Sequence, residues 1–270
     1  MARQSKPKLP KLTAANYYDR ESNLAYWSAS QVKAFLKCPA CAMAELKGEY
    51  QRPASTALLV GNYIDSYFEG PKHFEAYKER YKSQLFKKNG EPYSDVQKAN
   101  EMIVRATGDE LFMEYMRGRK QTIVTGRIEG VPFKAKLDVF RKGERIVDLK
   151  TVKDFEPVYA KGQGKLHPID FWEWPMQMAI YQELVRQKFG TRLPVYLAII
   201  TKQDVPDLEI VEIPQEKLDA EMEYLKEKIF YFDGIKQGII EADRCEDCAY
   251  CRSTHKLTAP KSYNEIMLGD

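Results

Sequence analysis

The sequence contains no long hydrophobic run. Its longest uninterrupted apolar stretch is Val195–Ile200, far shorter than the roughly 20 residues that a membrane-spanning helix needs. The N-terminal sequence MARQSKPKLPKLTAANYY is basic and lacks an apolar segment, so it does not have the pattern of a secretory signal. These two absences lead us to expect a cytoplasmic protein that does not associate with a membrane.

Cysteine is scarce and the net charge is small. The 270 residues include five cysteines, and an odd, low number predicts a reducing compartment rather than a disulfide framework. The formal net charge is only +3, so any binding of nucleic acid would depend on local basic patches. Internal repeats and low-complexity tracts are also missing. A content of 44% apolar and 30% charged residues is typical of a globular protein.

The spacing of apolar residues predicts helices toward both ends of the chain and strands in the middle. The expected helices begin near Ser28, with a break at Pro39, and continue at Ser55–Glu69, Lys72–Lys88, Ser94–Met116, Ile169–Phe189 and Glu216–Lys236. Two-fold spacing predicts an antiparallel three-strand meander and two later strands, at Gln121–Ile128, Val131–Phe140, Arg145–Lys150, Pro194–Lys202 and Leu208–Ile213. This order predicts a single α/β or α+β domain.

We expect this domain to cover residues 21–255. Its parts are a helical N-terminal region, a strand-rich core, and a last helix followed by a cysteine cluster, at residues 28–118, 121–213 and 214–255. Residues 1–20 are expected as a flexible basic tail and 256–270 as a C-terminal tail. The irregular segment Thr151–His167 is expected to form a mobile loop over the site.

The segment Lys134–Lys150 has the pattern of a β-hairpin with its turn at residues 141–144. Strict alternation predicts an apolar face and a polar-rich face, made respectively of Leu137, Val139, Val147 and Leu149, and of Lys136, Asp138, Phe140, Ile146, Asp148 and Lys150. A three-residue loop would place Asp138 directly opposite Asp148. A two-residue loop would make the two carboxylates diagonal neighbours.

Two carboxylates that face each other across a hairpin repel each other, so the arrangement needs a compensating interaction. Like charges in this arrangement cost about 0.2–1 kcal/mol, and a hard divalent cation removes that cost. The pair Asp138 and Asp148, with Lys150 on the same side, therefore indicates a candidate Mg²⁺ site. An ordinary amphipathic hairpin would explain the apolar face equally well.

These residues resemble the motifs of the PD-(D/E)XK nuclease superfamily. Asp138 on one strand and Asp148-Leu149-Lys150 on the next are followed by a helix with Gln177 and Tyr181. This order is similar to the RecB-type branch, whose helix carries Q-x-x-x-Y. The segments SASQVKAFLKCPA and GNYID (residues 61–65) also resemble N-terminal motifs of that branch. The resemblance covers residues of about 28 to 255.

The resemblance implies a restriction-endonuclease-like core and a role for each matching residue. Asp138, Asp148 and the Leu149 carbonyl would hold Mg²⁺ or Mn²⁺, and Lys150 would orient the attacking water or stabilise the developing charge. Asp65, which stands where the branch often has histidine, would complete the site or hold a second ion.

On the helix, Gln177 and Tyr181 would position DNA or the nucleophile, although a Gln and a Tyr four residues apart are common on any helix. Leu137 stands where the superfamily name has proline, and Asp148 where glutamate is more common.

The activity implied is that of a metal-dependent DNA exonuclease of the phage or prophage recombination type, similar to exodeoxyribonuclease VIII. Such an enzyme would resect linear duplex DNA from its ends in the 5′-to-3′ direction. The resemblance further suggests a homo-oligomeric ring and a single-strand annealing protein as partner. Two other readings of the residues stay open: a non-catalytic nucleic-acid-binding module, and a PD-(D/E)XK endonuclease.

Three cysteines near the C-terminus, Cys245, Cys248 and Cys251, form the run C-x₂-C-x₂-C. This spacing matches the first three ligands of a bacterial ferredoxin-type site, whose fourth cysteine precedes a proline. Cys38-Pro39 offers such a pair, and some RecB-type nucleases hold a [4Fe–4S] cluster with one early and three late cysteines. The resemblance therefore favours a structural [4Fe–4S] cluster.

Other uses of these thiols also fit the spacing. His255 could join the three late cysteines around Zn²⁺, and Cys41 could replace Cys38. Small buried thiols without any metal are the remaining alternative.

Two further patterns have ordinary structural interpretations. Trp172 and Trp174 could stack on an unpaired base, although packing beneath the sheet is the commoner role of such residues. A basic run could contact DNA, although charges of this kind more often form a solvated helix face; its residues are Lys78, Arg80, Lys82, Lys87 and Lys88.

Overall fold

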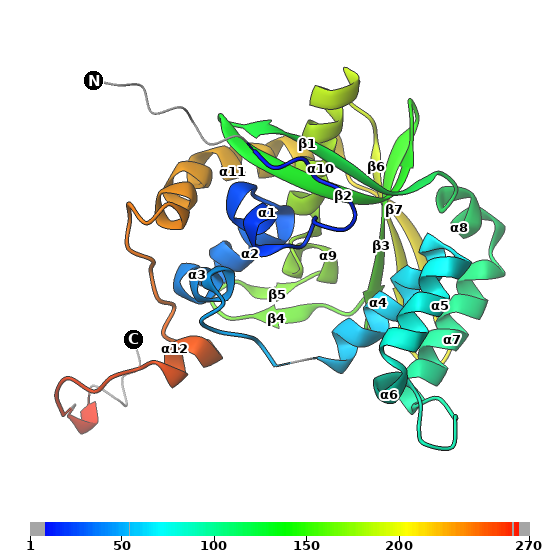
Figure 1. The fold of residues 1–270 in the computed structure, drawn as a ribbon, viewed down its shortest axis with the longest axis horizontal. Coiled ribbons are helices and arrows are strands. Elements are labelled where there is room, and N and C mark those ends of the chain that lie inside the picture. Colours follow the sequence, from blue (N-terminus) through cyan, green and yellow to red (C-terminus); the bar gives the residue numbers. More distant parts are fainter. Residues whose placement is uncertain (1–8, 54, 261, 265–270) are drawn as a thin grey trace.

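A mixed β-sheet with helices on both faces organises the computed structural model, which describes residues 9–53, 55–260 and 262–264 (Figure 1). The strand order is β1-β2-β3-β6-β7. These strands are β1 (Arg119–Ile128), β2 (Val131–Arg141), β3 (Arg145–Val152), β6 (Val195–Thr201) and β7 (Leu208–Glu212). The first three form the expected antiparallel meander, β6 pairs parallel with β3, and β7 closes the sheet antiparallel to β6. This is the expected restriction-endonuclease-like core.

The parallel pair β3 and β6 requires a long crossover, and this crossover carries α9 (Pro168–Phe171) and α10 (Trp174–Phe189). One helix over Ile169–Phe189 was expected. The structure divides it at Glu173, whose φ of +53° is a left-handed conformation that an α-helix interior does not adopt. Pro175 lies in the first turn of α10, where its missing N–H costs nothing.

The segment Thr151–His167 is not irregular throughout, contrary to expectation. It contains a small antiparallel pair, β4 (Val158–Ala160) and β5 (Gly164–Leu166). Gly162 and Gly164 both have φ of +79°, so the two glycines that suggested disorder instead make the tight turn of a hairpin.

In the N-terminal region a helix begins near Ser28 and breaks at Pro39, as expected. α2 (Ala29–Lys37) is capped by Ser28, whose side chain accepts a hydrogen bond from the Gln31 N–H at 3.4 Å. It follows α1 (Arg20–Ala25), and α3 (Pro39–Lys47) starts directly at the proline that ends α2.

The expectation of a flexible tail over residues 1–20 is wrong for its second half. Tyr17 is buried, and its backbone carbonyl accepts a hydrogen bond from the buried Lys134 ammonium of β2. The Tyr26 hydroxyl likewise donates to the Pro10 carbonyl at 3.0 Å. Residues 1–8 lie outside the described part of the chain.

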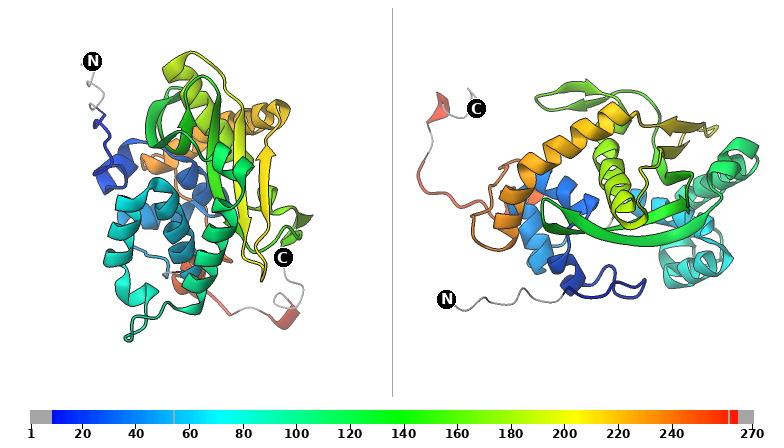
Figure 2. Two further views of the ribbon diagram at one scale, coloured as in Figure 1. Left: turned by 90° about the vertical axis from the view of Figure 1, so that its right-hand side faces the viewer. Right: turned by 90° about the horizontal axis from the view of Figure 1, so that it is seen from above.

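Two groups of helices cover the two faces of the sheet (Figure 2). α10 and α11 (Gln215–Lys236) pack with α2 on one face and enclose the larger hydrophobic core. The other face carries a second core beneath a group of shorter helices. These are α4 (Thr56–Glu69), α5 (Pro71–Arg80), α6 (Lys82–Leu85), α7 (Ser94–Thr107) and α8 (Glu110–Tyr115). None of the helices in the described ranges is long and apolar enough to cross a membrane.

The strict alternation expected for β2 is broken at Asp138. Val139 packs with Val147 in the smaller core, as expected, but Leu137 belongs to the larger core with Ile146. Two residues spaced by two should share a face in a regular strand, so the backbone departs from regular geometry at the aspartate between them. This irregularity lies at the functional site.

Candidate active site and cysteine centre

The site lies where β2 and β3 separate. Their ladder runs from Arg141 opposite Arg145 to Val139 opposite Val147, the register expected for a three-residue loop. One step further the backbones no longer pair, and Asp138 Oδ2 accepts a hydrogen bond from the Leu149 N–H at 3.0 Å instead. Because the N–H and C=O of one strand residue point to the same side, the Leu149 carbonyl also faces this gap.

Asp148 is the most deeply buried carboxylate of the site, with only 1% of its surface exposed. Its Oδ1 accepts a hydrogen bond from Gln177 Nε2 at 2.9 Å, and Lys150 forms an ion pair with its Oδ2. A buried charge without such partners would cost several kcal/mol. Among the described residues this ammonium is the only partner of Oδ2.

Gln177, on α10, connects the groups of the site. Its Nε2 donates to Asp148 and to the Tyr181 hydroxyl, the latter at 3.1 Å. Its Oε1 accepts from Lys33 Nζ at 3.0 Å and from Lys150 Nζ at 3.4 Å. All the hydrogen-bonding positions of this amide are therefore used, which fixes its orientation.

Lys33, on α2, was not among the residues that the sequence indicated. It lies within the SASQVKAFLKCPA segment already singled out, but its partner Gln177 is 144 positions away, and no local pattern connects the two. Burial and, to a lesser extent, the nearby Lys150 charge lower the pKa of Lys33 to about 8. Gln121 is a second missed residue: it has φ of +51° in β1 and donates from Nε2 to Asp138 Oδ1 at 3.2 Å.

The carboxylates of the site are crowded enough to oppose ionisation. Burial raises the pKa of Asp138 well above its usual range, and the charges of Asp148 and Asp65 raise it further. Burial also raises the pKa of Asp65, to about 7. Burial lowers the pKa of Lys150, but the adjacent carboxylates outweigh it and leave that pKa above the ordinary value. Carboxylates in this state gain most from a bound cation.

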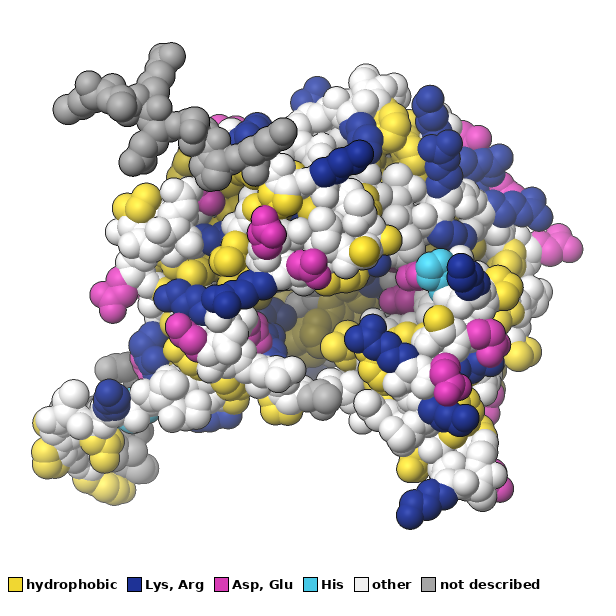
Figure 3. Space-filling view, viewed as in Figure 1, with side chains coloured by type: hydrophobic (Ala, Val, Ile, Leu, Met, Phe, Trp, Pro, Cys, Tyr) yellow, Lys and Arg dark blue, Asp and Glu magenta, His cyan; other side chains and the backbone are white. Residues whose placement is uncertain are grey.

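All seven residues expected at the site line one cavity of about 810 Å³. They are Asp65, Asp138, Asp148, Leu149, Lys150, Gln177 and Tyr181, and Lys33 joins them. In the space-filling view, the hollow between α2 and α4 has hydrophobic side chains on its floor and Lys and Arg side chains at its rim (Figure 3).

The donor set fits a hard divalent cation. Asp148 Oδ2 is a buried carboxylate oxygen whose one described partner is the Lys150 ammonium, and Asp138 and the Leu149 carbonyl face the same gap. Oxygen ligands of this kind suit Mg²⁺ or Mn²⁺. Asp65 lines the cavity, but within the described ranges it does not form a tight cluster with the other two carboxylates. The candidate metal ligands are therefore two carboxylates, of Asp138 and Asp148, and one backbone carbonyl, of Leu149.

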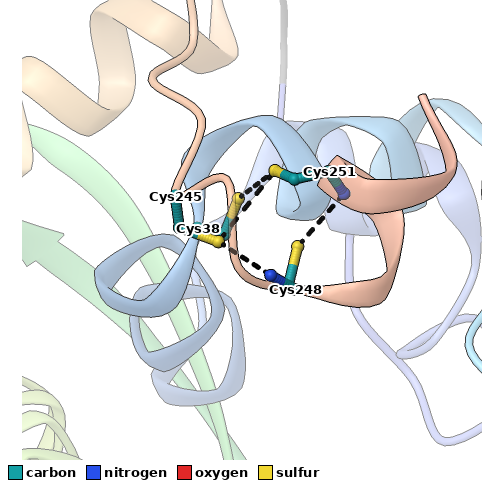
Figure 4. Close-up of side chains that lie close together, drawn as sticks. All are labelled: Cys38, Cys245, Cys248 and Cys251. Carbon is teal, nitrogen blue, oxygen red and sulfur yellow. Dashed lines mark hydrogen bonds between the residues drawn. The ribbon is translucent and has the colours of Figure 1, made fainter. Parts of the chain in front are cut away.

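Four cysteines form a separate cluster at the C-terminal end of α2 (Figure 4). Their sulfur atoms, from Cys38, Cys245, Cys248 and Cys251, all lie within 4.8 Å of one another. Cys38 ends α2 and begins α3, while Cys251 lies on α12 (Ala249–Ser253), which packs against α3. Backbone N–H groups of Cys248 and Cys251 point at the preceding thiols, at 3.3 and 3.4 Å.

The four sulfurs fit a single metal centre. The Cys38–Cys251 and Cys245–Cys251 sulfur distances are 3.6 and 4.0 Å. Thiolates at 2.3 Å around a tetrahedral Zn²⁺ would be about 3.8 Å apart. His255 and Cys41 are not part of this group of four, so a metal site that used either residue as a ligand does not match the arrangement.

The remaining sequence patterns have structural roles as well. Trp174 is 5% exposed, which confirms packing, whereas Trp172 is 44% exposed. Lys78, Lys82 and Lys87 form surface ion pairs with glutamates of neighbouring turns, as a solvated helix face would.

Comparison with known proteins supports the family suggested by these residues. The PDDEXK-like domain of unknown function (DUF3799) matches residues 28–254. The crystal structure of a candidate exonuclease from Eubacterium rectale has 36% sequence identity and a TM-score of 0.90, over 97% of this chain and all of its own. A second structure, of SSO0001, is 14% identical over 75% of this chain and 86% of its own, with a TM-score of 0.30, too low to indicate a shared fold.

No curated protein matches the sequence. The family match nevertheless covers most of the chain and includes every residue of the carboxylate site and all four clustered cysteines. This chain therefore belongs to the PDDEXK-like family, within the PD-(D/E)XK nuclease superfamily.

Proposed function

We propose that this protein is a metal-dependent exonuclease that hydrolyses phosphodiester bonds at the ends of linear duplex DNA. The observation that carries the proposal is the convergence of Asp138, Asp148 and the Leu149 backbone on one gap, with Lys150 beside them. The structural relative from Eubacterium rectale, a candidate exonuclease by name, supports the same activity.

Asp138, Asp148 and the Leu149 carbonyl would hold Mg²⁺ or Mn²⁺, which supplies a water of lowered pKa and polarises the phosphodiester. Lys150 has a raised pKa and stays protonated at neutral pH, so its ammonium is available to the developing negative charge. Tyr181 stays protonated too, because burial raises the pKa of its phenol well above the ordinary value.

Burial of the site favours ends over internal positions. With Asp148 only 1% exposed, the scissile phosphate has to enter the cavity rather than lie along the outer surface. A chain end can enter such a hollow more readily than the middle of a duplex. An endonuclease would need a groove open on both sides of the scissile bond.

The resemblance to phage recombination exonucleases extends the proposal. It adds 5′-to-3′ polarity, a homo-oligomeric ring, a single-strand annealing protein as partner and cytoplasmic action in recombination. Each of these rests on the sequence motifs alone, and strand-specific end labels and size measurement in solution test the first two.

At the cysteine centre we propose a structural metal site. The order of one early and three late cysteines favours a [4Fe–4S] cluster, whereas the sulfur distances are nearer to those of a tetrahedral zinc site. Visible absorbance together with iron and zinc analysis of the purified protein separates the two. Neither result affects the hydrolysis, which needs no electron transfer.

The proposed activity is tested on linear and covalently closed circular duplex DNA, each with Mg²⁺ or Mn²⁺ and with EDTA. We expect progressive loss of the linear DNA, an intact circle, and no loss in EDTA. Cutting of the circle would make the protein an endonuclease. Binding without cleavage under every metal condition would instead support a non-catalytic module.

A further inference from the structure

A second hollow opens beside the catalytic cavity. It has a volume of about 760 Å³, within the range of about 300–1,000 Å³ typical of sites that hold a small organic group. The two hollows share residues of α4 and β3, among them Asp65, Leu149 and Lys150. A group attached to a phosphate at the carboxylates would therefore reach this second hollow directly.

The walls of this hollow carry aromatic and apolar side chains that folding leaves open. Trp172 and Leu58 line it and are 44% and 64% exposed; Trp174 also lines it but is only 5% exposed. A large indole gains free energy when it is covered. An exposed indole beside a catalytic cavity is therefore a candidate binding surface.

The Trp172 ring is held in place before any ligand binds. It packs edge-to-face against Phe171, with ring centroids 4.9 Å apart. Its backbone carbonyl accepts a hydrogen bond from Lys33 Nζ at 3.4 Å, and Lys37 Nζ lies 5.5 Å from the ring centroid. Lys33 also binds Gln177, so one side chain positions both the indole and the catalytic network.

Cations accompany the aromatic surface. Lys150, Lys153 and Lys202 line the hollow with Trp172. Three carboxylates, of Asp65, Asp154 and Glu156, line it as well, and Asp154 Oδ2 is 3.3 Å from Lys153 Nζ. Aromatic side chains for the bases combined with lysines for the backbone are typical of sites for single-stranded nucleic acid.

We propose that Trp172 stacks on an unpaired base of the strand being cut, next to the scissile phosphate. A base within a duplex has both faces covered by its neighbours and cannot stack on a side chain. The nucleotides at the cleaved end are therefore unpaired when the bond breaks, and Trp172 is a positioning residue that holds them there. This inference rests on the proposed nuclease function.

Tryptophan fluorescence tests the stacking without any cleavage. The protein has three tryptophans, and Trp27 and Trp174 are 1% and 5% exposed, so quenching by a ligand reports mainly on Trp172. In EDTA, a short oligothymidylate should quench the wild type, whereas a covalently closed circular duplex should quench it much less.

Two substitutions separate stacking from folding. Trp172→Phe should lose most of the quenching but bind the oligothymidylate nearly as well, because phenylalanine also stacks. Trp172→Ala should bind it about 10-fold or more weakly, with an unchanged circular dichroism spectrum. Phe230→Ala, at an even more exposed aromatic residue on α11 (61% exposed), is the matched control and should bind like the wild type.

Abasic DNA identifies the stacked base in the cleavage reaction. Removal of one base near the end should slow the wild type by about 10-fold at a single position, and Trp172→Ala should be equally slow with and without that base. Equal abasic penalties in both proteins, or unchanged oligothymidylate binding by Trp172→Ala, would overturn the inference. If no DNA is cleaved at all, the nuclease proposal fails, while the fluorescence titration still decides the stacking.

Discussion

The carboxylate site and the cysteine cluster are both arrangements of metal ligands, and they differ in almost every other respect. The carboxylates line an 810 Å³ cavity together with the ammonium of Lys150. The four sulfurs lie within 4.8 Å of one another, and two of them, on Cys38 and Cys251, belong to residues that are at most 3% exposed and 213 positions apart in sequence. An open ligand set can exchange water and substrate; a closed one can only hold parts of the chain together.

From this difference we expect the carboxylate site to carry out the chemistry and the cysteine cluster to stabilise the fold. A substitution among the carboxylates should therefore change activity far more than it changes stability. A substitution among the cysteines should first of all lower the stability of the fold. It should affect activity only indirectly, because Cys38 ends α2, the helix that carries Lys33.

The largest effect is expected for Asp148→Asn. It removes a metal-binding charge but keeps the shape, and the loss of several kcal/mol of metal-assisted transition-state stabilisation corresponds to about a 1,000-fold or greater fall in kcat. Initial rates on linear DNA measure it. Asp204→Asn, in an exposed loop, is the control and should keep full activity. A fall of less than about tenfold would be incompatible with a ligand role.

A large effect on stability is expected for Cys248→Ser. Loss of one of four ligands should release the metal and lower the free energy of unfolding by several kcal/mol, which urea titration measures. Cys41→Ser provides the comparison, because Cys41 is buried beside the cluster but is not part of it. The same loss of metal from both variants would show that the ligand set has been assigned wrongly.

An intermediate effect is expected for Lys33→Met. Without the ammonium, the Gln177 amide loses one of its two donors to Oε1 and its orientation is less well defined. We expect a 10- to 100-fold lower kcat, about the size seen for residues that orient metal ligands, with little change in unfolding. A Lys33→Arg variant that restores part of the rate supports this role. An effect on KM alone would instead make Lys33 a substrate contact.

The smallest effect concerns Lys236, which belongs to neither region. Burial lowers its pKa to about 7, against an ordinary value of 10.5, so between these values the unfolded chain binds more protons than the folded one. Stability should therefore rise with pH across this window, by no more than about 1.4 kcal/mol per pH unit. Urea titrations near pH 7 and pH 9 should show this rise in the wild type and a smaller one in Lys236→Met. Parallel pH profiles would contradict the assignment.

Local patterns were enough to predict the parts of the site that lie on one hairpin. The turn at residues 141–144 sets the register, and the register brings Asp138 to β3 beside Asp148 and Lys150. The early partner of the three late cysteines also followed from a local pair, Cys38-Pro39.

Features created by tertiary packing could not be predicted in this way. Lys33 reaches Gln177 only because α2 packs beside α10, and Tyr17 is ordered by a lysine of β2 far along the chain. Asp138, where the alternation breaks, likewise accepts a hydrogen bond from Gln121 in the neighbouring strand. In each case the partner is remote in sequence, and the local spacing of apolar residues gives no information about such contacts.

The most direct test of the central claim is the anomalous diffraction of crystals soaked in Mn²⁺. We predict one strong peak within coordination distance of the Asp138 and Asp148 carboxylates and the Leu149 carbonyl oxygen, and its loss in Asp148→Asn. A manganese ion bound elsewhere, with these three groups uninvolved, would contradict the account.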